Sequence, residues 1–230
     1  MAASDLTDES KSVGWKQTVI VISVVTLLSL TYAIVRYNIV REVPYANLPL
    51  FISNKAIALA ATILIGLSFL LGPLARVFHH RFAHHLYLRK HLGIAGFGVA
   101  AVHAVISLVL LRPAYYPRIF AGSGRLNAQG EVFLLFGILA FLIFTAISVT
   151  SLPPIESHMH PAQWKFVQRL GYLAYAFVLL HVGFLGWNGW WRADSWQFGL
   201  ISISLLAALF IIFVLIMRLI VIAMGPPPKR

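Results

Sequence analysis

Two histidines lie deep within apolar stretches of the chain and share a local sequence pattern. His103 and His181 each follow a leucine-glycine pair, Leu92-Gly93 and Leu170-Gly171, with nine mostly apolar positions between the glycine and the histidine. An imidazole at membrane depth is costly unless it is paired or bound to a ligand, so each histidine is a candidate functional residue. Two of them, similarly placed and 78 residues apart, indicate one shared ligand.

The chemistry that best suits two neutral imidazoles on facing helices is axial ligation of a low-spin haem iron. Zinc normally takes four ligands, and nothing else at this depth offers a third. The alternative is that the histidines hydrogen-bond between helices and that nearby small residues pack the helices together. We expect a single haem, because no second pair of histidines lies at a matching offset along the two segments. Small residues that would leave room for a flat macrocycle are Gly96, Gly98, Ala100, Ala101 and Ala104.

The composition indicates a membrane protein. The 230 residues are 60% hydrophobic and only 11% charged, with a mean hydropathy of +0.84. The formal net charge of +11 lies in short connections between apolar segments, so we expect charges that anchor the chain at a membrane surface and no nucleic-acid partner. The absence of cysteine excludes disulfides, iron-sulfur clusters and thiol catalysis.

The elements that must position the histidines are six apolar segments, each long enough to cross a bilayer. They lie near residues 15–37, 52–78, 91–111, 131–151, 166–187 and 198–224. The first shows no clear cleavage site, so we expect a retained span and not a signal peptide. The predicted fold is an all-α bundle of six transmembrane helices, formed by one domain over residues 15–224, with tails at residues 1–14 and 225–230.

The distribution of positive charge predicts the orientation of the bundle. Eleven of the eighteen Lys and Arg residues fall on the side that holds both termini, which favours termini in the cytosol. At a rise of about 1.5 Å per residue, His103 lies roughly 13 Å from Arg112, and His181 lies roughly 9 Å from Trp187. Both rings therefore fall in the outer half of the membrane. Because the third and fifth spans run in the same direction, the two imidazoles can meet.

A haem in the outer half leaves the inner half without an electron carrier. Gly93 and Gly171 lie ten residues, about 15 Å, inward of the histidines and would leave room for a planar group. Arginine and lysine hold phosphate through charge-assisted hydrogen bonds, so the side chains around these glycines suit a flavin. Ordinary anchoring at the membrane surface explains them equally well. The side chains concerned are Arg89, Lys90, His91, Trp164, Lys165, Gln168 and Arg169.

These residues fall within stretches that resemble the transmembrane domain of the STEAP metalloreductases, within the ferric reductase-like superfamily. The stretches are Leu88-Arg-Lys-His-Leu-Gly93, His103-Ala-Val-Ile-Ser-Leu108, Ser148-Val-Thr-Ser-Leu-Pro153, Trp164-Lys-Phe-Val-Gln-Arg-Leu-Gly-Tyr172, and His181 with Gly186-Trp187. Together they cover roughly residues 86–190 in the order and spacing of that family. His91 stands where the family usually has glutamine.

The resemblance implies one b-type haem on His103 and His181, with FAD on the cytosolic side. It implies flavin contacts from Arg89, Lys90, Trp164 and Gln168, to which we add the neighbouring His91. Electrons would pass to a ferric or cupric chelate outside the cell, across the plasma or inner membrane, and family members are trimers. The metalloreductases carry an N-terminal NADPH-oxidising domain, whereas about fifteen residues precede the first span here. We therefore expect the electron donor to be a separate soluble flavin or NAD(P)H reductase.

Four arginines on the outer side suit a basic platform for an anionic metal chelate: Arg112, Arg118, Arg125 and Arg192. Pairing with haem propionates and lipid headgroups would explain them equally well. Two other functions stay open. One is a haem-binding membrane subunit of the methionine sulfoxide reductase type, which passes electrons to a partner protein. The other is a haem-free channel, transporter or assembly subunit.

Overall fold

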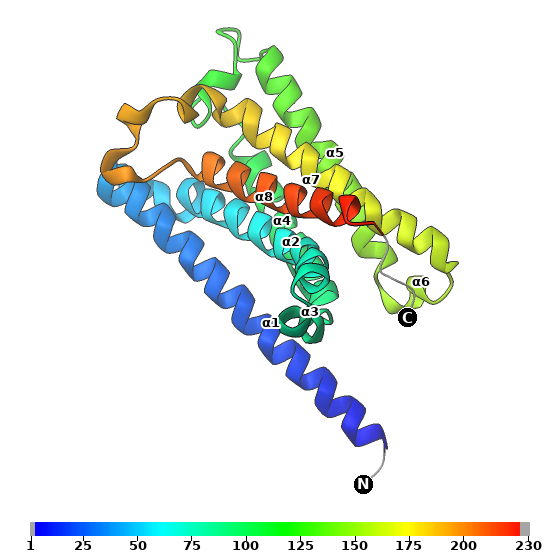
Figure 1. Ribbon diagram of the computed structural model, residues 1–230. Helices are drawn as coiled ribbons and strands as arrows, with labels where there is room; N and C mark the ends of the chain where they lie inside the picture. Colours follow the sequence, from blue (N-terminus) through cyan, green and yellow to red (C-terminus); the bar gives the residue numbers. More distant parts are fainter. Residues whose placement is uncertain (1–2, 226–230) are drawn as a thin grey trace.

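The computed structural model describes residues 3–225, which form a bundle of long helices joined by short helical connections (Figure 1). Six helical segments in this part of the chain are long and apolar enough to cross a membrane. They are Trp15–Val40, Tyr45–Val77, Leu88–Val109, Ala128–Thr150, Pro161–Trp190 and Gln197–Ala223. The predicted all-α fold with six spans is confirmed, with most boundaries within a few residues of those expected.

The helices follow one another along the chain with few long connections. The described tail residues 3–14 continue α1, and of the predicted tail 225–230 only Gly225 lies within the described residues. The spans are α1 (Ala3–Ile34) with its π-helical end η1 (Val35–Val40); η2 (Tyr45–Asn47) and η3 (Leu48–Ile52) leading into α2 (Ser53–Val77); α4 (Leu88–Val109); α5 (Ala128–Thr150); α7 (Pro161–Trp190); and α8 (Ile203–Ala223). The connections hold α3 (His79–Phe82), η4 (Ala83–His85), η5 (Pro117–Ile119), α6 (Pro153–Glu156), η6 (Ala193–Ser195) and η7 (Gln197–Gly199).

Local capping explains where α7 begins, five residues before the expected start. The His160 side chain accepts a hydrogen bond from the Ala162 amide (3.3 Å), and the Gln163 side chain accepts one from the His160 amide (3.4 Å). Pro161 then occupies the first helical turn, where its missing N–H costs nothing. This cap adds more than a turn to α7 on the side that holds Gln168.

α2 is the central helix of the bundle and packs against α1, α4 and α8. α5 packs along α7, and α8 lies beside both α2 and α7 (Figure 1). α4 and α7, the helices that carry the two histidines, therefore rest mainly on different neighbours. α4 rests on α2, whereas α7 rests on α5.

The outward faces of the long helices are apolar. Exposed side chains such as Leu27, Val105, Leu108, Leu142 and Leu219 lie where lipid would surround the bundle. The chain is a multi-pass membrane protein. We call the side that holds the start of α1 and the end of α8 the termini side, and the other the opposite side. Arg36, in η1 at the opposite side, is buried (2% exposed) and donates a hydrogen bond to the Leu200 carbonyl.

Gly96 lets α4 approach α2 closely. A Cβ at this position would lie 2.9 Å from the Ile65 backbone nitrogen and 2.8 Å from its Cγ1. A Cβ at Gly98, two residues further on, would have no neighbouring atom within 4 Å. The small residues of α4 therefore divide: Gly96 serves helix packing, as the alternative interpretation of the sequence held, whereas Gly98 faces outward.

We expect Gly96→Val to destabilise the bundle by about 1–3 kcal/mol, because the new side chain forces α4 away from α2. Gly98→Val makes the same chemical change on the same helix where there is space, and should leave stability nearly unchanged. Thermal unfolding of both purified variants in detergent measures the difference. Equal losses in the two variants would show that α2 and α4 do not meet at Gly96.

Candidate functional site

His181 is held by α5. Its Nδ1 lies 2.9 Å from the carbonyl oxygen of Phe133, and its ring stacks on the Phe133 ring with centroids 4.2 Å apart. A carbonyl oxygen can only accept, so Nδ1 carries the proton and Nε2 keeps its lone pair. One turn along α5, Gly137 makes room for the ring, since a Cβ there would lie 2.7 Å from Nδ1. The imidazole is thus fixed in one tautomer and one orientation.

His103 is held by the side chain of Asn54 in the first turn of α2. Its Nδ1 lies 2.9 Å from Oδ1 of Asn54, and the Asn54 amide nitrogen donates to Oγ of Ser107 (2.9 Å). That hydroxyl lies 3.3 Å from Nδ1 of His103 and 3.5 Å from Nε2. With the amide oxygen as acceptor, His103 also carries its proton on Nδ1 and keeps the Nε2 lone pair.

His103 on α4 and His181 on α7 lie close enough for their charges to interact. Each has its Nδ1–H bound by a helix outside the pair, α2 for His103 and α5 for His181. Histidines that ligate metals usually donate the other ring N–H to a carbonyl or a similar acceptor, which fixes the tautomer and makes the ring a stronger ligand. The pair therefore fits two axial ligands of one haem iron through their Nε2 atoms.

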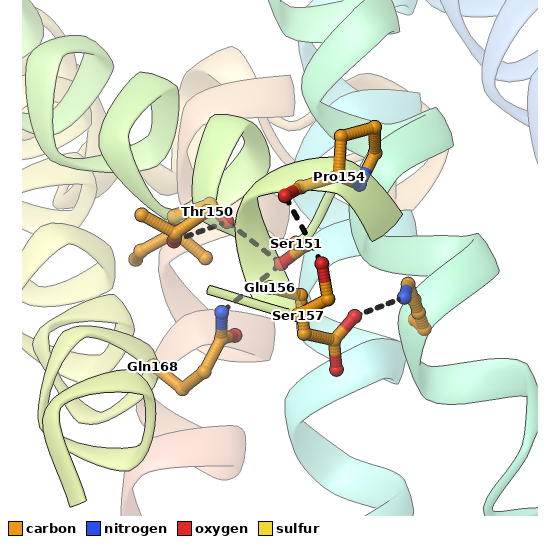
Figure 2. A network of polar contacts seen from close by, with 8 residues as sticks. Thr150, Ser151, Pro154, Glu156, Ser157 and Gln168 are labelled. Carbon is orange, nitrogen blue, oxygen red and sulfur yellow. Dashed lines mark hydrogen bonds and ion pairs between the residues drawn. The ribbon is translucent and has the colours of Figure 1, made fainter. Parts of the chain in front are cut away.

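A cavity on the termini side joins α2, α4, α5 and α7. Arg89 is fixed at its rim because its Nε donates to the Ser68 carbonyl (3.2 Å), while the Ser68 hydroxyl donates to the Arg89 carbonyl (2.7 Å). Across the cavity, Gln168 donates to the Ser151 hydroxyl (3.0 Å; Figure 2). The residues that line the cavity are Ile65, Ser68, Phe69, Arg89, Lys90, Gly93, Ile94, Phe97, Phe144, Ile147, Ser148, Ser151 and Gln168.

An ion pair stands beside this cavity. The Lys90 ammonium lies 2.5 Å from the Glu156 carboxylate of α6 (Figure 2). The cavity measures about 50 Å³, well below the roughly 300–1,000 Å³ of ordinary ligand pockets. A planar ring would enter only if the long side chains at the rim, Arg89, Lys90 and Gln168, move aside.

Residues 57–180 match the family described as the ferric reductase like transmembrane component. The chain belongs to this family. Among curated proteins it is similar to metalloreductase STEAP2 of Mus musculus, with 28% identity over 211 residues that cover 76% of this chain and 43% of that protein. It is similarly related to metalloreductase STEAP3 of Rattus norvegicus, with 28% identity over 198 residues that cover 70% of this chain and 41% of that protein. The chain thus spans less than half the length of these relatives.

The match to the ferric reductase-like family covers most of both candidate sites. It includes His103 and all five predicted flavin residues, and it ends one residue before His181. Asn54 lies just outside its start. The termini-side cavity therefore lies wholly within the part of the chain that defines the family.

Two of the predicted flavin residues do not line the cavity. His91 lies on another face of α4, where its ring meets the edge of the Trp15 ring at 4.7 Å. At 100° per residue, His91 is rotated about 145° from the mean direction of Arg89, Lys90, Gly93 and Phe97. Trp164 lies one turn before Gln168 on α7, and its buried Nε1–H finds no hydrogen-bond partner within the described residues. A buried donor without a partner is costly, so Trp164 suits an incoming acceptor.

The four arginines predicted to meet an acceptor all lie exposed on the opposite side. Arg112 follows the end of α4, Arg118 lies in η5 and Arg125 lies in the turn before α5. Arg192 directly follows α7 in sequence, just past its C-cap Trp191. Their role as an acceptor platform stays a prediction.

Sequence reasoning missed the residues that anchor the imidazoles. Phe133 contributes through its backbone, and Gly137 contributes by lacking a side chain, so neither residue type indicates a role. Asn54 did carry a signal, because a buried amide in an apolar span requires a hydrogen-bond partner. The partner itself, 49 residues away, follows only from the packing of α2 against α4.

Proposed function

We propose that this chain carries electrons across the membrane from a reduced flavin on the termini side, through one b-type haem, to a ferric or cupric chelate on the opposite side. The observation that carries the proposal is the pair of imidazoles whose Nδ1 atoms are both occupied. The similarity to metalloreductases and the membership of the ferric reductase-like family support transmembrane metal reduction as the function. When bound, the flavin and haem supply the electron-carrying chemistry, which no side chain of this chain replaces.

The chain's own residues hold the two groups. His103 and His181 would hold the haem iron through their Nε2 atoms. On the termini side, Arg89 would bind a flavin phosphate through the N–H groups of its guanidinium and Lys90 would bind one as a point charge, while Gln168 offers an amide to the ring. Trp164 donates its Nε1–H, and Gly93 keeps the wall between α4 and the ring thin.

The electron donor, the acceptor and the assembly are part of the same proposal. The termini side is the cytosolic side, where a separate soluble flavin or NAD(P)H reductase regenerates reduced FAD. Arg112, Arg118, Arg125 and Arg192 attract an anionic chelate to the other face of the cell membrane, plasma or inner. We expect a homotrimer, as the resemblance of the sequence to the STEAP family implies.

Replacing either histidine tests the haem site. We expect His103→Ala and His181→Ala to lose the low-spin haem spectrum, with haem affinity reduced at least about tenfold, since loss of an anchoring partner alone costs that much. The measurement is the visible spectrum of protein purified from haem-replete cells. His158→Ala removes an exposed imidazole from the connection before α7 and should keep the native spectrum. A normal low-spin spectrum in both site variants would refute the ligand assignment.

Arg89→Gln tests the flavin site. Loss of one charge-assisted bond to phosphate is worth about 1.5–3 kcal/mol, so the Kd for FAD should rise roughly 10–100-fold. Titration followed by flavin fluorescence gives the Kd, and an unchanged haem spectrum shows that the bundle is intact. Arg81→Gln removes an equal charge from the exposed end of α3 and serves as the matched control.

The ion pair beside the cavity allows a second test of the flavin site, in which the affinity for FAD should change in the opposite direction. Glu156→Gln frees Lys90 from its carboxylate partner. FAD should then bind more tightly than to the native protein, whereas Arg89→Gln binds it less tightly. If Arg89→Gln and Arg81→Gln have the same Kd for FAD, and Glu156→Gln leaves that Kd unchanged, the flavin binds elsewhere.

The acceptor is tested by the double substitution Arg112→Gln with Arg118→Gln. Rates with ferric citrate, an anionic chelate, should fall about tenfold at low ionic strength, because the charges that steer it are gone. The deficit should shrink in high salt and be absent with a neutral electron acceptor. A native protein that takes electrons from flavin yet reduces no chelate, and reduces only a partner protein, would show that the acceptor is a protein.

A further inference from the structure

The two candidate haem ligands are anchored by different kinds of group. His181 binds a backbone carbonyl, which every residue at position 133 would offer. His103 binds the amide side chain of Asn54, which only a few residue types can reproduce. The hydrogen bond on His103 is therefore the one that the sequence can adjust.

Asn54 is fixed on both ends of its amide. It is 1% exposed, its oxygen faces Nδ1 of His103, and its nitrogen donates to Ser107, one turn beyond His103 on α4. The amide thus meets α4 at two adjacent turns. With both ends engaged, it cannot rotate without breaking a buried hydrogen bond, which costs about 1–3 kcal/mol.

Asn54 is surrounded by side chains that lie at the opposite side of the bundle, as defined above. The Tyr116 hydroxyl interacts with the Asn54 side chain, and burial raises the pKa of Tyr116, so the hydroxyl stays neutral. The next residue, Lys55, places its ammonium over three aromatic rings: 4.4 Å from the centroid of Phe51, 5.5 Å from Tyr37 and 5.7 Å from Tyr116. Asn54 therefore lies in a packed cluster built from three separate segments of the chain.

We propose that Asn54 is a positioning residue that holds His103 with its proton on Nδ1 and lowers the reduction potential of the haem. This inference rests on the proposed haem function. A hydrogen bond accepted from Nδ1–H gives the ring more anionic character and makes Nε2 a stronger donor. A stronger donor favours ferric over ferrous iron, so removing the bond raises the potential.

Two nearly isosteric substitutions separate this role from a merely structural one. Asn54→Leu removes the acceptor and should shift the ferrous-to-ferric ratio at fixed solution potential about tenfold toward ferrous, which is about 59 mV for a one-electron couple. Asn54→Asp keeps an oxygen at the same place and, when ionised beside Lys55, accepts more strongly, so it should shift the ratio toward ferric. Damage to packing alone would not move the two variants in opposite directions.

The experiment is a spectroelectrochemical titration of haem in the purified full chain. Ser53→Ala is the matched control, because Ser53 is the residue before Asn54 and donates its hydrogen bond to the Leu48 carbonyl. If Asn54→Leu fails to retain haem, Asn54→Asp decides alone, and a potential at or above the native value overturns the proposal. Potentials that are equal in Asn54→Leu, Ser53→Ala and the native protein also overturn it. Absence of haem from the native protein would instead refute the proposed function.

Discussion

The constraint on which this structure depends is that a buried imidazole must have its N–H paired. Inside a bilayer no water is available to do this, and an unpaired donor costs several kcal/mol. The chain meets the constraint with two acceptors, a carbonyl of α5 and an amide of α2. Because those acceptors occupy Nδ1, each ring has only Nε2 left, and the tautomer needed by a metal ligand is set before any ligand binds.

The helix arrangement follows from this constraint. Each imidazole requires a neighbouring helix as its anchor, so α4 pairs with α2, and α7 pairs with α5. Close approach within the α2–α4 pair depends on Gly96, and His181 depends on the missing side chain of Gly137. α8 then joins the two pairs by packing on both α2 and α7. The space between α4 and α7 is thus bounded by two pairs of helices, α2 with α4 and α5 with α7.

Sequence patterns were sufficient for the fold and for selecting the two histidines as candidates, because segment length and burial cost are local properties. They were insufficient wherever a residue's role depends on its neighbour across the bundle. His91 follows Lys90 directly in a motif of basic residues, yet helix rotation turns it toward Trp15. Gly96 could equally have lined a cofactor or packed a helix, and only the position of Ile65 decides between them. Asn54 requires the α2–α4 packing to be known before its partner can be named.

The termini-side cavity differs from the histidine site in how its polar groups are paired. There Lys90 and Glu156 are charged and partly exposed, so they can exchange partners at little cost. Lys90 already pairs with Glu156, and Gln168 with Ser151, which satisfies both in the absence of any ligand. An anionic ligand would compete with Glu156 for Lys90, whereas nothing competes for the Nε1–H of Trp164 among the described residues. The histidine site is therefore organised before binding, whereas Lys90 at the cavity would exchange partners on binding, which fits the haem and the flavin that we propose.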